Sequence, residues 1–111
     1  MNVKTVYDSG TLTALLSGDI DHHSARKMRR IIDGDIEICR PEKLILDFRR
    51  VQFMDSSGIG LIMGRYRLMS LYGGIVRVVN VPDELERMMK LSGLSALDII
   101  ESRGIKREAA K

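Results

Sequence analysis

The five residues 44–48 form a short run that is apolar except for Asp47, with charged residues on both sides. A run of this length and composition is typical of a strand that is covered on both of its faces. Such strands occur mainly in sheets whose parallel neighbours are connected through helices. The run therefore predicts an α/β fold in which helices cover the strand.

Strand and helix signals alternate along the first half of the chain. Residues 2–7 and 11–17 are rich in Thr, Val and Leu, and the Asp-Ser-Gly sequence between them predicts an antiparallel hairpin. Asp21 or Ser24 can cap the helix that follows, and Pro41 stops its continuation. The apolar face of this helix repeats every three or four positions, at Ala25, Met28, Ile32, Ile36 and Cys39.

The second half continues the alternation. We expect a loop over 49–55 with Val51, Phe53 and Met54 tucked beneath it, helices over 57–72, 82–91 and 103–111, and strands over 75–79 and 96–100. A chain of 111 residues suffices for one hydrophobic core, so we predict a single domain over residues 1–111. It is an α/β domain with a mixed, mostly parallel sheet of about five strands and about four helices, in the order β-β-α-β-α-β-α-β-α.

Composition argues against several classes of protein. The single cysteine, Cys39, excludes an internal disulfide framework and suits a reducing compartment, so we expect a cytoplasmic protein. No apolar stretch approaches the roughly 18 residues of a membrane span, and we expect no membrane partner. The net charge of +3 is spread along a chain without Trp, which disfavours nucleic acid as a partner. One cysteine and two histidines argue against a metal site, and we expect no cofactor.

A pair of serines stands at the start of the helix predicted over 57–72. Ser56 and Ser57 lie between Asp55 and two glycines, just before an amphipathic run. The first N–H groups of a helix are unpaired and carry partial positive charge, so a serine there is well placed to hold a phosphate. An apolar core alone does not require two hydroxyls and two glycines at this point.

Enzymatic interpretations fit this segment poorly. Gly58, Gly60 and Gly64 are spaced one residue too widely for a dinucleotide-binding fingerprint, and no Gly-Lys-Ser/Thr sequence provides a phosphate-binding loop. A hydrolase would use a serine of the pair with His22 or His23 as its base, but the Gly-x-Ser-x-Gly turn is missing. Gly60 and Gly64 instead permit close packing against the sheet or a partner. We therefore expect no enzyme, and a small nucleotide- or phosphate-binding enzyme is the alternative.

The remaining interpretation is a serine that receives a phosphate. Phosphorylation adds a charge of about −1.5 to −2 at pH 7, which the N-terminus of a helix tolerates. Asp55 is adjacent in sequence, and Asp19 and Asp21 join it if the sheet places their loop alongside. Adding a phosphate to such an acidic cluster changes how a partner protein binds this surface, without refolding the domain.

Three segments resemble the STAS family of anti-sigma factor antagonists, and the resemblance extends over residues 3–103. Residues 17–23 are similar to the loop after the family's second strand, residues 53–60 to its phosphoacceptor loop, and residues 89–94 to the segment closing its third helix. The Asp-His-His sequence in the first segment and the Gly-Arg-Tyr sequence at 64–66 are most similar to the family's sporulation member. A general-stress antagonist is the alternative within the family.

The resemblance implies partner switching. The unphosphorylated protein would bind an anti-sigma factor that is also an ATP-dependent serine kinase, and would so free a sigma factor of the sigma-F type. The kinase, which carries the ATP, would phosphorylate Ser56 and end the interaction, and a separate serine phosphatase would reverse it. Ser57 would cap the helix with its hydroxyl. The surface implied to bind the partner comprises Asp19, Asp21, His22, His23, Asp55, Ser56, Ser57, Gly58, Gly60 and Arg65.

Overall fold

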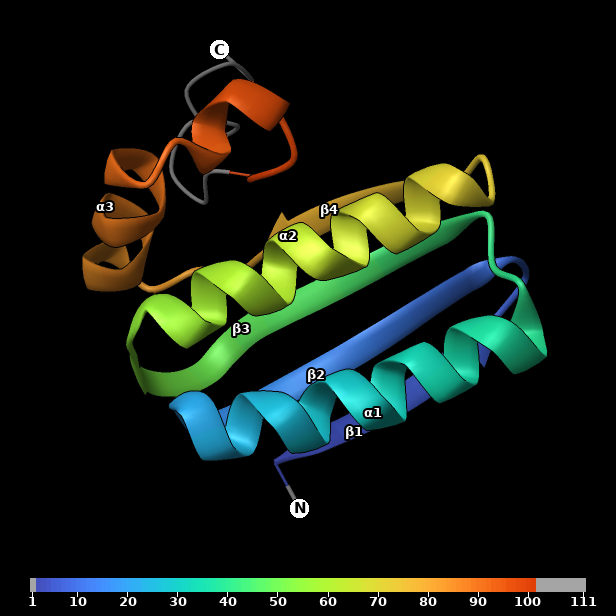
Figure 1. Cartoon of the computed structure of the whole chain (residues 1–111), viewed down its shortest axis with the longest axis horizontal. Helices are drawn as coiled ribbons and strands as arrows, with labels where there is room; N and C mark the ends of the chain where they lie inside the picture. Colours follow the sequence, from blue (N-terminus) through green and yellow to red (C-terminus); the bar gives the residue numbers. More distant parts are fainter. Residues whose placement is uncertain (1, 102–111) are drawn as a thin grey trace, which may run out of the picture.

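A computed structural model describes residues 2–101 and places them in a four-stranded sheet with two long helices on one face (Figure 1). The spatial order of the strands follows the chain, with the first pair antiparallel and the other neighbours parallel. The predicted α/β class with a mixed, mostly parallel sheet is confirmed. The elements are β1 (Val3–Asp8), β2 (Thr11–Ile20), α1 (His22–Cys39), β3 (Lys43–Met54), α2 (Ser56–Leu71), β4 (Ile75–Val79), α3 (Asp83–Leu91) and the 3₁₀ helix η1 (Leu94–Leu97).

The core lies between the sheet and the two long helices. Alternate residues of β2 and β3 point toward α1 and α2, and all of them are buried: Leu12, Ala14, Leu16, Leu44, Leu46 and Phe48. From α1, Met28, Ile32 and Ile36 are buried as predicted, whereas Ala25 and Cys39 are only half-buried. The opposite face of the sheet is more open, and Val6 and Ile75 are about half exposed there. The prediction that the strand over 44–48 is covered on both faces is therefore wrong, since Ile45 and Asp47 on this side are only half-buried.

The predicted loop over 49–55 is wrong, because β3 continues through this segment to Met54. Two irregularities in the pairing of β2 with β3 each place an extra residue in β3. A bulge of this kind bends the strand and changes which side chains face inward. The buried positions are consequently Phe48, Val51 and Met54, spaced by three, while Phe53 points outward and is 54% exposed. The period of two that identifies a strand is lost.

The strand predicted over 96–100 is also wrong. Leu94–Leu97 forms the 3₁₀ helix η1, and Asp98 follows in the left-handed region with a φ of 57°. Only one residue then pairs with the sheet, Ile100 beside Val78 of β4. The described residues therefore contain four strands, three α-helices and one 3₁₀ helix, and the helix predicted over 103–111 lies outside them.

Helices α1 and α2 run side by side across the same face of the sheet and begin at the same end of it (Figure 1). Each connects two parallel strands, so each begins where a strand ends. The starts of the two helices therefore lie at the carboxyl ends of β2 and β3, where ligands and partners bind in many α/β proteins. Within residues 2–101, no helix is long and apolar enough to span a membrane.

Candidate functional site

The structure brings the two predicted loop segments together at the ends of β2 and β3. Asp19 pairs with Phe53 and Ile20 pairs with Met54 in the parallel register. The backbone N–H of Asp55 then donates to the carbonyl oxygen of Ile20 at 3.1 Å. The acidic residues before α1 and the serine pair at the start of α2 thus belong to one surface, here called the acidic tip and defined by Asp19, Asp21, Asp55 and Ser56.

Asp21 is the N-cap of α1. The sequence leaves Asp21 and Ser24 as alternatives for this role. Its carboxylate accepts from the backbone N–H groups of His23 and Ser24 at 3.0 and 2.9 Å. The Ser24 hydroxyl accepts from the Asp21 N–H at 3.0 Å, which completes a capping box, and donates to the Asp19 carbonyl oxygen at 2.8 Å. His22 and His23 are exposed beside this cap.

The hydrogen bonds at this cap also affect the ionisation of Asp21. The backbone N–H of Ser24 holds the pKa of the Asp21 carboxyl below its ordinary value, with further help from the Ser24 hydroxyl and the N–H of His23. Hydrogen bonds to a carboxylate favour its charged form. Asp21 is therefore a fixed, exposed negative charge on the acidic tip at neutral pH.

The second helix is capped by Asp55, and the predicted capping by the Ser57 hydroxyl is wrong. The N-cap of α2 is Asp55, whose carboxylate accepts from the backbone N–H of Ser57 at 2.8 Å. Ser57 contributes its N–H to the cap, and its side chain is half-buried. Ser56 is the first residue of the helix and is exposed. Of the two hydroxyls, that of Ser56 is the more accessible to another protein.

The two glycines that follow have different surroundings. Gly58 is buried, and a Cβ atom at this position would collide with the side chain of Met54. Gly58 therefore permits the start of α2 to lie close against the end of β3. Gly60 is exposed, and nothing lies within 4 Å of where its Cβ atom would be, which is also true of Gly64. Close packing of these two glycines against the sheet is therefore excluded.

Phe53 is a surface residue, although its predicted place is beneath a loop. It is 54% exposed and pairs with Asp19, so an aromatic ring stands at the edge of the acidic tip. Exposed aromatic residues are common energetic anchors of protein interfaces. The only sequence signal for Phe53 is that it begins the segment 53–60, which resembles the family's phosphoacceptor loop.

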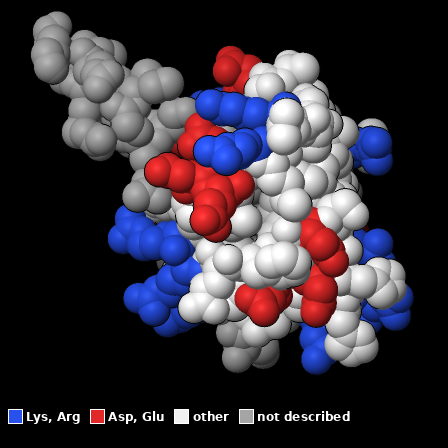
Figure 2. Space-filling view, turned by 90° about the vertical axis from the view of Figure 1, so that its left-hand side faces the viewer, with Lys and Arg blue, Asp and Glu red and all other residues white. Residues whose placement is uncertain are grey.

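Figure 2 views the molecule from the end at which α1 and α2 begin, and acidic side chains gather in groups on this face.

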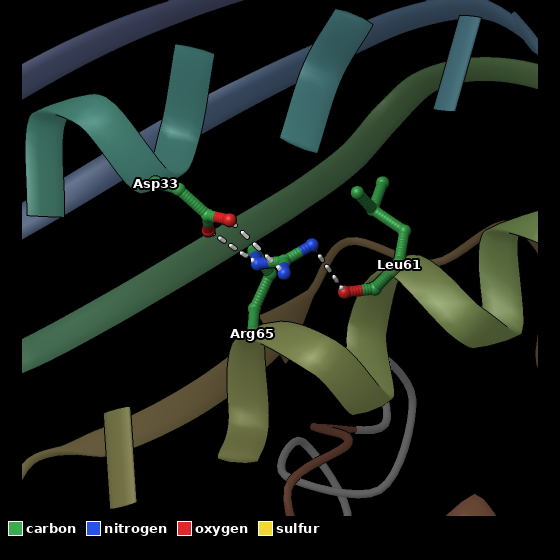
Figure 3. A network of polar contacts seen from close by, with 3 residues as sticks. All are labelled: Asp33, Leu61 and Arg65. Atoms are coloured by element: carbon green, nitrogen blue, oxygen red, sulfur yellow. Dashed lines mark hydrogen bonds and ion pairs between the residues drawn. The ribbon is translucent and has the colours of Figure 1, made fainter. Parts of the chain in front are cut away.

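Arg65 lies apart from the acidic tip. It is 5% exposed on the side of α2 that faces α1. Its guanidinium binds the carboxylate of Asp33 on α1 through two contacts, 2.7 Å from Nε and 3.3 Å from Nη2, and donates from Nη1 to the Leu61 carbonyl oxygen at 3.3 Å (Figure 3). This pair ties the two helices together. Arg65 therefore positions the two helices, and its predicted contact with a partner stays a prediction.

Burial works against both charges of this pair. It raises the pKa of the Asp33 carboxyl, while the attraction of Arg65 and Arg29 opposes that rise. Burial likewise lowers the pKa of the Arg65 guanidinium, against the attraction of Asp33. An arginine remains protonated at neutral pH, and its attraction favours the charged form of the Asp33 carboxyl. Removing one partner would leave the other charge in a poor environment.

Among residues 2–101, no group of three or more His, Cys, Asp and Glu side chains is arranged to hold a metal ion. The acidic tip is built from the capping interactions of Asp21 and Asp55. A model of the STAS domain family matches residues 2–105 of the sequence.

The chain belongs to the STAS domain family.

Relatives of this STAS domain include several antagonists of anti-sigma factors. It is 36% identical over 94 residues to the anti-sigma F factor antagonist of Paenibacillus polymyxa. This match covers 85% of this chain and 80% of the relative. It is 26% identical over 107 residues to the anti-sigma-B factor antagonist of Bacillus subtilis, with coverages of 91% and 89%. The sigma-F relative is thus the more similar of these two.

Solved structures of the sporulation member of the family are also similar to this STAS domain. The anti-sigma factor antagonist SpoIIAA in its unphosphorylated form superposes with a TM-score of 0.80 at 26% identity, covering 96% of this chain and 92% of the other. The Bacillus cell fate determinant SpoIIAA in the phosphorylated form gives a TM-score of 0.73 at 26% identity, with coverages of 97% and 96%. The resemblance predicted from the sequence, to the stage II sporulation protein AA, is confirmed.

Proposed function

We propose that this STAS domain is an anti-sigma factor antagonist of the sigma-F type, regulated by phosphorylation of Ser56. In its unphosphorylated state it binds a cytoplasmic anti-sigma factor through the acidic tip and so releases the sigma factor. The anti-sigma factor is also the serine kinase, binds the ATP, and modifies Ser56. A serine phosphatase restores the binding-competent state. The 36% identity to an anti-sigma F factor antagonist supports the sigma-F circuit over the general-stress circuit.

The observation that carries this proposal is the position of Ser56. Its hydroxyl is exposed at the first residue of α2, directly after the Asp55 cap and at the end of the strand beside Asp19. A kinase can reach this hydroxyl without unfolding the helix. Ser57 is less suitable, because it is half-buried and faces the neighbouring helix α1.

A phosphate on Ser56 changes the binding surface without disturbing the fold. The N-terminus of a helix favours a negative group, so α2 remains intact. On the surface, the phosphate adds to the charges of Asp19, Asp21 and Asp55. One like-charge contact at about 5 Å and an effective dielectric constant of about 20 costs roughly 3 kcal/mol. Solvent reduces this value, but about 2.7 kcal/mol already weakens a complex roughly 100-fold.

Mapping the phosphorylated residue tests this proposal. The wild-type chain is used to capture its anti-sigma factor from a lysate of the source organism, and the captured kinase is then supplied with ATP. We expect one phosphate, located on Ser56 by mass spectrometry. Ser56→Ala should bind the kinase but accept no phosphate, whereas the matched control Ser57→Ala should still be phosphorylated. Phosphate on Ser57, or capture of no anti-sigma factor, would contradict the proposal.

A further inference from the structure

A groove of about 470 Å³ runs between α1 and α2, starting beside the acidic tip. Its walls come from successive turns of the two helices, with His22, Arg26 and Arg29 on α1 and Ser57, Gly64 and Arg67 on α2. From Ser57 to Gly64 the helix rises by about 10 Å, at 1.5 Å per residue. The groove is therefore long enough for three or four residues of extended chain.

The charge of the groove is opposite to that of the acidic tip. Four arginines line it, and no carboxylate is among its lining residues. Arg65 is neutralised by Asp33, which lies behind it on α1 and is also attracted by Arg29. Among the described residues, Arg26 has a hydrogen bond only with the ring of His22, at 3.1 Å, and neither Arg26 nor Arg67 has an ion pair. The groove thus presents more positive charge than the domain itself compensates.

Two glycines keep the groove hollow. Gly60 and Gly64 lie in the interior of α2, where glycine is less favourable than alanine by up to about 1 kcal/mol. Neither position has a neighbour within 4 Å that would collide with a Cβ atom. Packing within the domain therefore does not require glycine at either position. The two glycines leave the backbone of α2 open toward the groove.

We infer that this groove binds an acidic segment of the protein partner, three or four residues long and placed next to Ser56. The inference rests on the proposed function only for the identity of that partner. Carboxylates of such a segment would pair with Arg26, Arg29 and Arg67, since arginine forms well-directed contacts with carboxylates. A nucleic acid fits less well, because its phosphates would continue from the groove onto the acidic tip and no Phe, Tyr or Trp side chain lines the groove for base stacking.

The groove that would bind the acidic segment lies directly beside the acidic tip. Ser57 and His22 line the groove, while Ser56 and Asp21, their immediate neighbours in sequence, belong to the acidic tip. One surface thus presents both signs of charge within a short distance. Such alternation fixes the orientation of a bound partner and excludes partners with a single uniform charge.

Nuclear magnetic resonance of the full ¹⁵N-labelled chain tests the inference without a kinase or any modification of Ser56. The probe is a capped tetraglutamate peptide at low ionic strength, because exposed charges are screened by salt. We expect its largest amide shifts at residues 22–29 and 57–67. Arg29→Gln combined with Arg67→Gln should weaken binding roughly tenfold. The matched control, Lys27→Gln with Arg30→Gln, removes the same charge from exposed positions outside the groove and should change binding less than twofold.

Three results would overturn the inference. Shifts spread over the whole surface would mean that the groove is not a site. Equal weakening by both double variants would mean that only net charge matters. A stronger response of the same amides to an oligothymidylate or to ATP would assign the groove to phosphates rather than to a protein. Each result can be obtained whether or not Ser56 is phosphorylated by a kinase, so failure here is distinct from failure of the proposed function.

Discussion

The backbone N–H of Asp55 donates a hydrogen bond of 3.1 Å to the carbonyl oxygen of Ile20, which joins the starts of the two long helices. Ile20 precedes the N-cap of α1, and Asp55 is the N-cap of α2. The contact extends the pairing of β2 with β3 by one step beyond the strands. Together with the parallel register of the two strands, it places both aspartate caps on one surface with Ser56.

Removing the exposed ring at this surface should affect binding and leave the fold unchanged. We predict that Phe53→Ala weakens binding of the anti-sigma factor by at least about tenfold, because buried interface aromatics are frequent hot spots. The midpoint of thermal unfolding should stay within about 2 °C, since the ring is 54% exposed in the free protein. Leu71→Ala, at the exposed far end of α2, is the control and should change neither quantity. Unaltered affinity of Phe53→Ala would remove this residue from the interface.

The Asp33–Arg65 pair should be coupled in stability. Asp33→Ala leaves a guanidinium that is 5% exposed without its carboxylate, and we expect a loss of roughly 2 kcal/mol in the free energy of unfolding. Arg65→Met should cost less, because Asp33 is about one-third exposed and can be hydrated. The double variant should lose less than the sum of the single losses. Urea unfolding of the four proteins measures this, and strict additivity would show that the two side chains do not interact.

The two glycines at the start of α2 should respond in opposite ways to an added methyl group. Gly58→Ala should lower the free energy of unfolding by roughly 1–3 kcal/mol, because the new Cβ meets the buried Met54 side chain. Gly60→Ala should leave the stability unchanged or raise it by up to about 1 kcal/mol, since its Cβ has open space. Denaturant unfolding compares the two variants. Equal effects would show that contact with Met54 does not decide the choice of glycine.

The Asp21 cap should make part of the stability depend on pH. The pKa of Asp21 is lowered in the folded state by the Ser24 N–H, so the folded state favours the charged form. The resulting stabilisation is present above the unfolded pKa, near 3.8, and is lost as the pH falls through the folded pKa. Asp21→Asn retains a capping side chain that does not titrate. Between pH 7 and pH 2 the wild type should therefore lose more stability than this variant, and equal losses would contradict the shift.

Much of the fold follows from patterns that the sequence displays directly. Helix α1 has apolar residues at helical spacing and an aspartate at its start, and its predicted face at Met28, Ile32 and Ile36 is buried. Strand β3 shows the limit of such patterns. Its first part has a clear apolar run, but the bulges opposite β2 shift the inward positions to Val51 and Met54, and the strand pattern disappears.

The candidate site was predictable in outline but not in detail. The acidic and serine segments are visible in the sequence, whereas their contact depends on the parallel register of Ile20 with Met54. Whether Asp55 or a serine caps α2 depends on the backbone angles at a single residue, which composition does not determine. The groove between the helices was not predictable either, because it depends on how closely α1 and α2 pack side by side on the sheet.

The most direct test of the phosphorylation switch is the affinity of the anti-sigma factor for the two states of this chain, measured by isothermal titration calorimetry. The chain is phosphorylated on Ser56, checked by mass spectrometry, and compared with the unmodified chain and with Ser56→Asp. We predict binding that is roughly 100-fold weaker for the phosphorylated chain, and also weaker for Ser56→Asp, with circular dichroism spectra that remain native. Equal affinities for the phosphorylated and unmodified chains would contradict the switch.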